Sequence, residues 1–149
     1  MKVSILTLGC KVNQAESSLI ESNLKNSGYE IVPFSESEKP DICVINTCSV
    51  TSKSDYQSRQ LIRRAQKAGA RVIVTGCYSE LNRDSVRSMP GVEGVIENKS
   101  KLTIVGMLSG KTSADTLCPS SNRIRLFIKI QDGCNNKCSY CAIPKARGR

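Results

Sequence analysis

The 149-residue chain contains no histidine and no tryptophan, and its aromatic residues are four tyrosines and two phenylalanines. Without histidine there can be no Ser-His-Asp or Cys-His catalytic unit, no His-ligated zinc and no His proton shuttle. No apolar run approaches the ~20 residues that span a bilayer. The N-terminus also lacks the apolar core and cleavage site of a signal peptide. Any metal site in this chain would have to be built from cysteine.

Eight cysteines are available for such a site. A disulfide framework requires a secreted protein, whereas cytosolic thiols stay reduced, and clustered cysteines there bind metal or do chemistry. Because no secretion signal is evident, we expect a cytoplasmic protein with no membrane segment, and we favour metal ligands over disulfides. The length suits one domain and the start of a second.

Short apolar runs rich in β-branched residues alternate with segments of helical spacing. The runs predict strands over residues 3–8, 29–32, 42–46, 71–75 and 92–96. Helical stripes lie within residues 19–24, 61–68, 81–89 and 102–108, with a capping box expected at Ser54 and Gln57 and helix stops at Gly28 and Gly69. This alternation predicts an α/β fold built on a doubly wound parallel sheet.

The amino-acid composition of the chain changes after the last of these predicted helices. We expect residues 1–110 to form the α/β domain and the polar, turn-rich residues 111–122 to form a linker. Residues 123–149 would begin a second, incomplete domain. Within it, alternating basic and apolar residues predict a strand over 123–130, followed by a cysteine-rich loop.

Three cysteines each lie two residues past the end of a predicted strand: Cys10, Cys48 and Cys77. Ligands bind at this edge of open α/β sheets, so three loops could bring three thiols together. Gly9 and Gly76 would let the backbone come close to a bulky ligand. Three unrelated buried thiols are the alternative. Cys43 lies inside a predicted strand, and we assign it to the core.

The other group is tighter, with the spacing C-x3-C-x2-C at Cys134, Cys138 and Cys141. A zinc ribbon would instead show two C-x2-C pairs and four ligands. Three thiolates on a [4Fe–4S] cube leave one iron open for a non-protein ligand, which indicates chemistry more than structure. A zinc site that borrows Cys118 as its fourth ligand stays open.

This loop, with Tyr140 before its last cysteine, resembles the signature of radical S-adenosylmethionine enzymes. The resemblance implies that Cys134, Cys138 and Cys141 hold a [4Fe–4S] cluster whose open iron binds S-adenosyl-L-methionine, and that Tyr140 lies near the adenine. It implies no catalytic residue in this chain beyond the cluster ligands. Cofactors carry such radical chemistry, so a protein without histidine can host it.

The segments around the first three cysteines resemble the N-terminal domain of methylthiotransferases within that group: residues 8–14, 46–51 and 76–78. This resemblance implies that Cys10, Cys48 and Cys77 hold a second, auxiliary [4Fe–4S] cluster. Residues 10–14, Cys-Lys-Val-Asn-Gln, look most like the branch that methylthiolates N6-threonylcarbamoyladenosine beside the tRNA anticodon. The implied partners are tRNA and an electron donor such as a flavodoxin or ferredoxin, with no DNA and no membrane.

Seven basic residues could contact RNA phosphates, four on one predicted helix and three in the tail: Arg59, Arg63, Arg64 and Lys67, then Lys145, Arg147 and Arg149. For the helix, a solvated surface explains the charges equally well. Two other functions stay open, a non-catalytic iron–sulfur or zinc-binding RNA or redox module and a flavodoxin-like nucleotide binder with incidental cysteines. Because the resemblance implies a barrel of ~200 residues or more after the loop, we expect this chain alone to be inactive.

Overall fold

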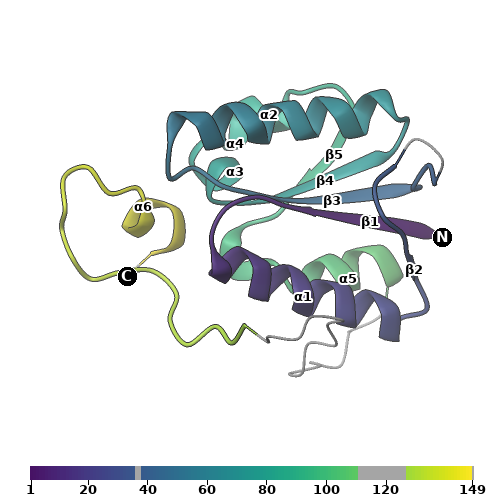
Figure 1. Cartoon of the computed structure of the whole chain (residues 1–149), viewed down its shortest axis with the longest axis horizontal. Helices are drawn as coiled ribbons and strands as arrows, with labels where there is room; N and C mark the ends of the chain where they lie inside the picture. The colour runs from purple at the N-terminus through teal and green to yellow at the C-terminus, as the bar shows by residue number, and fades with distance from the viewer. Residues whose placement is uncertain (36–37, 111–126, 149) are drawn as a thin grey trace.

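The computed structural model describes residues 1–35, 38–110 and 127–148. Its centre is a sheet of five parallel strands in the order β2-β1-β3-β4-β5 (Figure 1). The strands are β1 (Lys2–Thr7), β2 (Glu30–Ile31), β3 (Ile42–Thr47), β4 (Arg71–Gly76) and β5 (Val92–Val95). This is the flavodoxin-like order of doubly wound sheets, which confirms the predicted fold class of the first domain.

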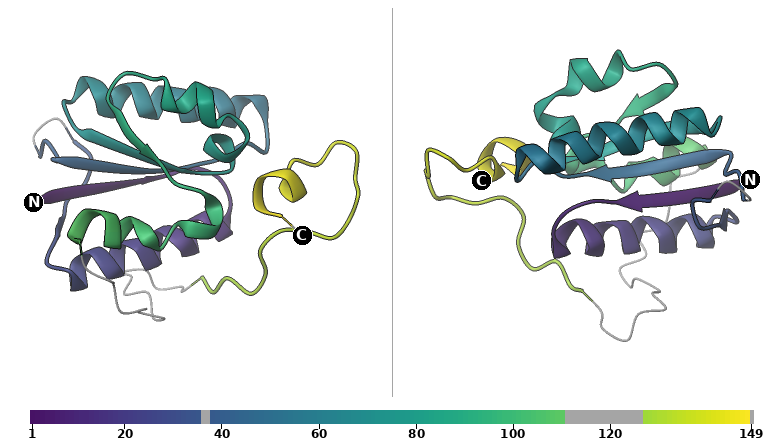
Figure 2. Two further views of the ribbon diagram at one scale, coloured as in Figure 1. Left: turned by 180° about the vertical axis from the view of Figure 1, so that it is seen from behind. Right: turned by 45° about the horizontal axis from the view of Figure 1, so that its top comes forward.

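Helices cover both faces of the sheet. The helices α1 (Lys11–Asn26) and α5 (Thr103–Ser109) lie on one face, and α2 (Ser52–Lys67), α3 (Cys77–Leu81) and α4 (Arg83–Arg87) lie on the other (Figures 1 and 2). The prediction of one short helix within residues 81–89 was wrong, because Leu81 ends α3, Val86 lies in α4 and Met89 follows α4. The short helix α6 (Ile143–Arg147) contacts α3 and the 3-10 turn at Asn98–Ser100.

Two apolar layers hold the helices on the sheet, and β3 serves both because its side chains alternate. Ile42 and Val44 belong to the layer under α1 and α5, which also contains Val3, Ile20, Leu24, Ile104 and Val105. Cys43 and Ile45 belong to the opposite layer, with Ile62, Val72, Val74 and Val86. Cys43 is fully buried, which confirms its assignment to the core, and burial raises the pKa of its thiol to about 12.

The helix ends follow the expected backbone chemistry, with one correction. Gly28 and Gly69 directly follow the last caps of α1 and α2 with φ of +86° and +80°, which confirms the predicted stops. The capping box is at Thr51 and Ser54, so the prediction of Ser54 and Gln57 was wrong. The helix begins at Ser52, and Thr51 Oγ1 accepts the Ser54 N–H at 3.1 Å while Ser54 Oγ accepts the Thr51 N–H at 3.0 Å.

The predicted strand over residues 123–130 is wrong where the structure describes it. Residues 127–130 form no strand, and Ile128 and Ile130 are 75% and 94% exposed. A strand needs a neighbouring backbone to pair with, and no described segment pairs with this one. Residues 123–126, the predicted linker and Cys118 lie outside the described residues. In the part that is described, no helix has the length and apolar character to cross a membrane.

Candidate metal centre at the carboxyl edge of the sheet

The first cysteine triad, Cys10, Cys48 and Cys77, lies at the edge where the sequence predicts it. Cys10 follows β1 as the N-cap residue of α1, Cys48 follows β3, and Cys77 opens α3 after β4. Because β1, β3 and β4 are neighbours, their carboxyl ends share one edge of the sheet. Cys48 and Cys77 are each 4% exposed, whereas Cys10 is exposed to solvent.

Two buried polar side chains tie the three cysteine loops together. Asn13 Nδ2 donates to the carbonyl oxygens of Leu8 at 2.7 Å and Thr47 at 3.0 Å, which joins the loops after β1 and β3. Thr47 Oγ1 donates to the Thr75 carbonyl at 2.6 Å and accepts the Ser79 N–H at 3.2 Å, which joins the loops after β3 and β4. These residues set the loop positions from which the thiols project.

The glycines beside the cysteines are required by crowding between the loops themselves. A Cβ at Gly9, where φ is +95°, would lie 2.6 Å from Cys48 Sγ. A Cβ at Gly76, where φ is +105°, would lie 2.3 Å from the Thr47 carbonyl oxygen. Only glycine accepts both the positive φ and the close approach. The glycine at position 9 thus lets the backbone of the first loop come close to Cys48, and the space between these loops is too small for even a methyl group.

The second triad, Cys134, Cys138 and Cys141, lies in the segment before α6. The Cys134 N–H donates to the Gly148 carbonyl at 3.1 Å and the Cys141 N–H donates to the Cys138 carbonyl at 3.2 Å, so the backbone closes this segment into a loop. Cys138 is exposed and the other two thiols are half-buried. Tyr140 is 89% exposed, and its role near an adenine stays a prediction.

Neither triad is closed around a metal position. Among the described residues, no three cysteine, aspartate or glutamate side chains lie close enough together to hold a metal ion. The donor chemistry nevertheless fits an iron–sulfur cluster, because all seven described cysteines are free thiols and the first three share one edge of the sheet. Closing either ligand set requires its cysteine side chains or loops to move toward one another.

A buried ion network that the sequence analysis missed adjoins Cys77. Arg147 of α6 is 8% exposed, and its Nη1 donates to Glu16 at 2.8 Å while its Nη2 donates to Asn13 Oδ1 at 2.5 Å. Arg147 Nε donates to Cys77 Sγ at 3.3 Å. The buried Lys101 pairs with the same Glu16 carboxylate. A helix near the end of the chain therefore contacts the edge that carries the first triad.

The charges in this network stabilise one another. Burial alone would raise the pKa of Glu16, but hydrogen bonds and charge from Arg147 and Lys101 lower it to about 2. Burial alone would lower the pKa of Arg147, but its bonds to Glu16 and Asp132 raise it. Burial raises the pKa of the Cys77 thiol against the opposing effect of Arg147. A permanent positive charge thus lies beside the Cys77 sulfur.

The prediction that Arg147 faces RNA phosphates is wrong, because its guanidinium is buried and paired within the protein. Lys145 is exposed, and Arg149 lies outside the described residues. One sequence signal for the network was available. Glu16 shares a helix face with Asn13 and with the core residue Ile20, and a carboxylate on an apolar face needs a buried cation.

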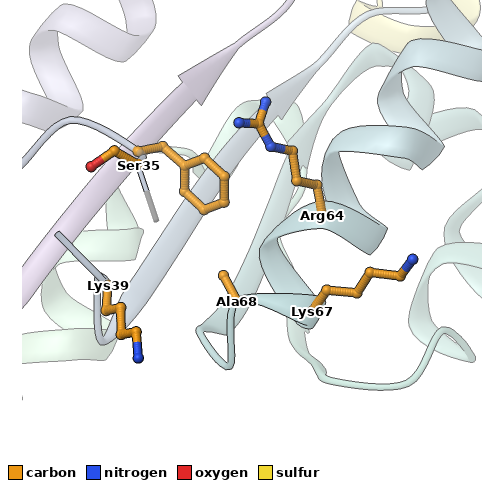
Figure 3. A pocket seen from close by; sticks show the side chains of 6 residues that line it. Ser35, Lys39, Arg64, Lys67 and Ala68 are labelled. Atoms are coloured by element: carbon orange, nitrogen blue, oxygen red, sulfur yellow. The ribbon is translucent and has the colours of Figure 1, made fainter. Parts of the chain in front are cut away.

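Helix α2 carries the other predicted basic residues, and two of them contact aromatic rings. The Arg59 guanidinium lies 5.7 Å from the centre of the Tyr78 ring and donates to Tyr78 Oη at 3.3 Å. The Arg64 guanidinium lies 5.2 Å from the centre of the Phe34 ring. Residues at the end of α2 line a pocket of about 460 Å³ together with the chain before β3 (Figure 3): Phe34, Ser35, Lys39, Arg64, Lys67 and Ala68. Contact between this helix and RNA stays a prediction.

A known protein family matches the part of the chain that forms the sheet and carries the first triad. The model of Uncharacterized protein family UPF0004 matches residues 2–97, which include β1 to β5 and the whole first triad. The chain therefore belongs to this family.

Curated relatives extend the similarity over the whole chain. The chain is 36% identical to threonylcarbamoyladenosine tRNA methylthiotransferase MtaB of Bacillus subtilis (strain 168), with 98% of the chain and 36% of that relative covered. Identity to the protein of the same name from Aquifex aeolicus (strain VF5) is 34%, with 100% of the chain and 41% of the relative covered. These names confirm the resemblance to methylthiotransferases. The chain spans between about a third and two fifths of its relatives' length.

A second kind of methylthiotransferase is also similar. The chain is 32% identical to ribosomal protein uS12 methylthiotransferase RimO of Aquifex aeolicus (strain VF5), with 100% of the chain and 34% of that relative covered. The names of these relatives thus include both a modified tRNA nucleoside and a ribosomal protein.

Proposed function

We propose that this chain supplies the auxiliary-cluster domain and the S-adenosylmethionine cluster loop of a radical methylthiotransferase. The substrate of this methylthiotransferase is N6-threonylcarbamoyladenosine beside the anticodon of tRNA, and the enzyme works in the cytoplasm. The observation that carries the proposal is the arrangement of Cys10, Cys48 and Cys77 on three neighbouring strand ends of one sheet. The tRNA branch is supported by its greater identity, 36% against 32% for the ribosomal-protein branch.

In this proposal the first triad holds one [4Fe–4S] cluster and Cys134, Cys138 and Cys141 hold the other. When bound, the clusters and S-adenosylmethionine supply the radical chemistry that attaches a methylthio group at an unactivated C–H bond. The protein's own part is placement: Asn13 and Thr47 fix the three loops, and burial of Cys48 and Cys77 keeps water from their sulfurs. Tyr140 would lie near the adenine, and an electron donor such as a flavodoxin or ferredoxin would supply electrons.

Replacing one loop cysteine is expected to remove one cluster and spare the other. After anaerobic reconstitution, the unchanged chain should bind about eight irons and Cys134→Ala about four, because the two ligand sets are separate. Cys10→Ala should also bind about four, through loss of the other cluster. Cys43→Ala, which removes a core thiol outside both triads, is the matched control and should keep all the iron.

Iron, labile sulfide and zinc counts, with electron paramagnetic resonance, measure this outcome. In the unchanged chain and in Cys10→Ala, the cluster signal should shift when S-adenosylmethionine is added. Stoichiometric zinc without labile sulfide would overturn the proposal in favour of a non-catalytic zinc module. Loss of both clusters in Cys134→Ala would show that the two triads do not act separately.

We infer further that the 149-residue chain by itself has no methylthiotransferase turnover. It covers 36% of its Bacillus subtilis relative, and the residues described form a single five-stranded sheet. The assay incubates the reconstituted chain anaerobically with tRNA, S-adenosylmethionine and a reductant, then analyses the nucleosides by mass spectrometry. Detection of the methylthiolated nucleoside above a Cys134→Ala control would contradict this inference.

A further inference from the structure

We propose that Arg147 is a positioning residue that docks the loop of the second triad onto the edge of the first triad. In the docked state it donates a hydrogen bond to the sulfur of Cys77. The proposal rests on the proposed function for the identity of the clusters, but the docking itself concerns only this chain's own residues. It gives Arg147 a part in setting how the two cysteine triads lie relative to each other.

The contacts of Arg147 join the two parts of the chain. On the side of the first domain, its guanidinium donates to Glu16 and Asn13 of α1 and to Cys77 Sγ at the start of α3. On the side of the loop, Nη1 donates to Asp132 Oδ1 at 2.7 Å. Arg147 also follows the buried Ala146, whose carbonyl accepts a hydrogen bond from Asn98 Nδ2 at 2.5 Å.

Besides Arg147, the described contacts across the junction are the Asn98–Ala146 hydrogen bond, the packing of α6 on α3 and Lys11 over the Phe127 ring. Large apolar side chains before α6 point to solvent, with Ile128, Ile130 and Tyr140 at 75%, 94% and 89% exposed. Hydrophobic burial therefore contributes little to docking of this segment. The remaining ion pair across the junction joins the half-buried Lys129 to Glu16 at 3.1 Å, on the carboxylate that Arg147 already contacts. Among the described residues, the buried Arg147 guanidinium makes the most side-chain hydrogen bonds across the junction, to Glu16, Asn13 and Cys77.

The charge balance of the junction suits an anionic neighbour. Three cations, Arg147, Lys101 and Lys129, face two carboxylates, Glu16 and Asp132. The surplus positive charge lies beside the Cys77 sulfur, where a thiolate-bound cluster would place negative charge. Hydrogen bonds to cluster sulfurs raise the reduction potential, because they stabilise the more negative, reduced state.

Amide hydrogen exchange on the cluster-free chain tests the docking. In Arg147→Ala, exchange over residues 134–148 should accelerate at least about tenfold, because charge-assisted hydrogen bonds to buried partners are lost. Arg147→Lys should lie between Arg147→Ala and the unchanged chain, since an ammonium cannot form the planar fork. Lys145→Ala, on the same helix but exposed, is the matched control and should match the unchanged chain. Unchanged exchange in Arg147→Ala would overturn the proposal.

If Arg147→Ala unfolds the domain, the core thiol Cys43 will become open to alkylation. A second variant then tests the docking. Asp132→Asn removes a partner of Arg147 on the loop side and leaves Glu16, Lys101 and Arg147 in place. It should accelerate exchange over residues 134–148 while the amides of β3 and β4 stay protected. Unchanged exchange over the loop in both Asp132→Asn and Arg147→Lys would overturn the docking.

A redox titration tests the hydrogen bond to sulfur. In the Cys134→Ala background, which retains only the first cluster, Arg147→Ala should lower the cluster's reduction potential relative to Arg147→Lys and to the unchanged Arg147. An unchanged reduction potential in Arg147→Ala would contradict the proposed hydrogen bond from Arg147 to the Cys77 sulfur. If the chain binds no cluster at all, the proposed function fails, whereas the exchange result still decides whether Arg147 docks the loop.

Discussion

Gly76→Ala is expected to lower the free energy of unfolding by about 3–5 kcal/mol, the largest effect we expect from removing or adding a single methyl group in this chain. The backbone at Gly76 has φ of +105° and ψ of −178°, a region that only glycine enters readily. An added Cβ would also lie 2.3 Å from the carbonyl oxygen and 2.4 Å from the amide nitrogen of Thr47.

The clash cannot be relieved by rotating a side chain. Thr47 and Gly76 are register partners in adjacent central strands, so relief requires β3 and β4 to separate where the cysteine loops begin. Such a movement would also weaken the hydrogen bond from Thr47 Oγ1 to the Thr75 carbonyl. The loss of stability therefore combines backbone strain with disrupted pairing at the centre of the sheet.

Gly28→Ala is the matched control for backbone strain without crowding. Gly28 has φ of +86°, but a Cβ there would meet nothing within 4 Å. We expect a loss of about 1 kcal/mol, which is the cost of a positive φ alone. Urea unfolding followed by circular dichroism measures both variants. Equal losses in the two would contradict the argument that close approach of the strands requires glycine at position 76.

The parts of this fold that could be predicted are those with a local signal. Apolar runs bounded by polar turns located all five strands, and glycines with positive φ marked the ends of α1 and α2. The rule that ligands bind at the carboxyl edge of a parallel sheet then located Cys10, Cys48 and Cys77 at one edge, although among the described residues they do not lie close enough together to hold a metal ion. Each of these inferences needs only the order of residues within a short segment and one general rule of topology.

The parts that could not be predicted depend on contacts between distant residues. Glu16 and Arg147 are 131 positions apart, and nothing in the sequence around either residue identifies the other as its partner. Arg147 lies in a basic tail and therefore resembled a surface residue. The alternation in residues 123–130 similarly predicted a strand from local pattern alone, whereas a strand over 127–130 also requires a pairing partner.

Glu16→Gln is expected to lower the free energy of unfolding by about 3 kcal/mol at neutral pH. Folding lowers the pKa of this carboxyl group from its ordinary 4.5 to about 2, and each pKa unit corresponds to about 1.4 kcal/mol. Glutamine has nearly the same shape but no charge, so Lys101 and Arg147 lose the counter-charge that offsets their burial.

Glu21→Gln on the same helix is the control for an exposed ion pair. Glu21 accepts from Lys25 at 2.7 Å, but both side chains are partly exposed. Because water and salt screen such a pair, its loss should cost at most about 0.5 kcal/mol. The contrast between the two variants separates the effect of a buried carboxylate from that of a charge change on α1.

The pH dependence of the Glu16→Gln effect gives the sharper test. A carboxyl group whose pKa is lower in the folded state than in the unfolded state stabilises the fold above the unfolded pKa. That contribution is lost as the pH falls, from about 4.5, where the unfolded group takes up a proton, to about 2, where the folded group does. Denaturant unfolding at a series of pH values should therefore show the difference between the unchanged chain and Glu16→Gln shrinking across this window. A difference that stays constant down to pH 2 would mean that Glu16 stabilises the junction through its shape and hydrogen bonds, and not through its charge.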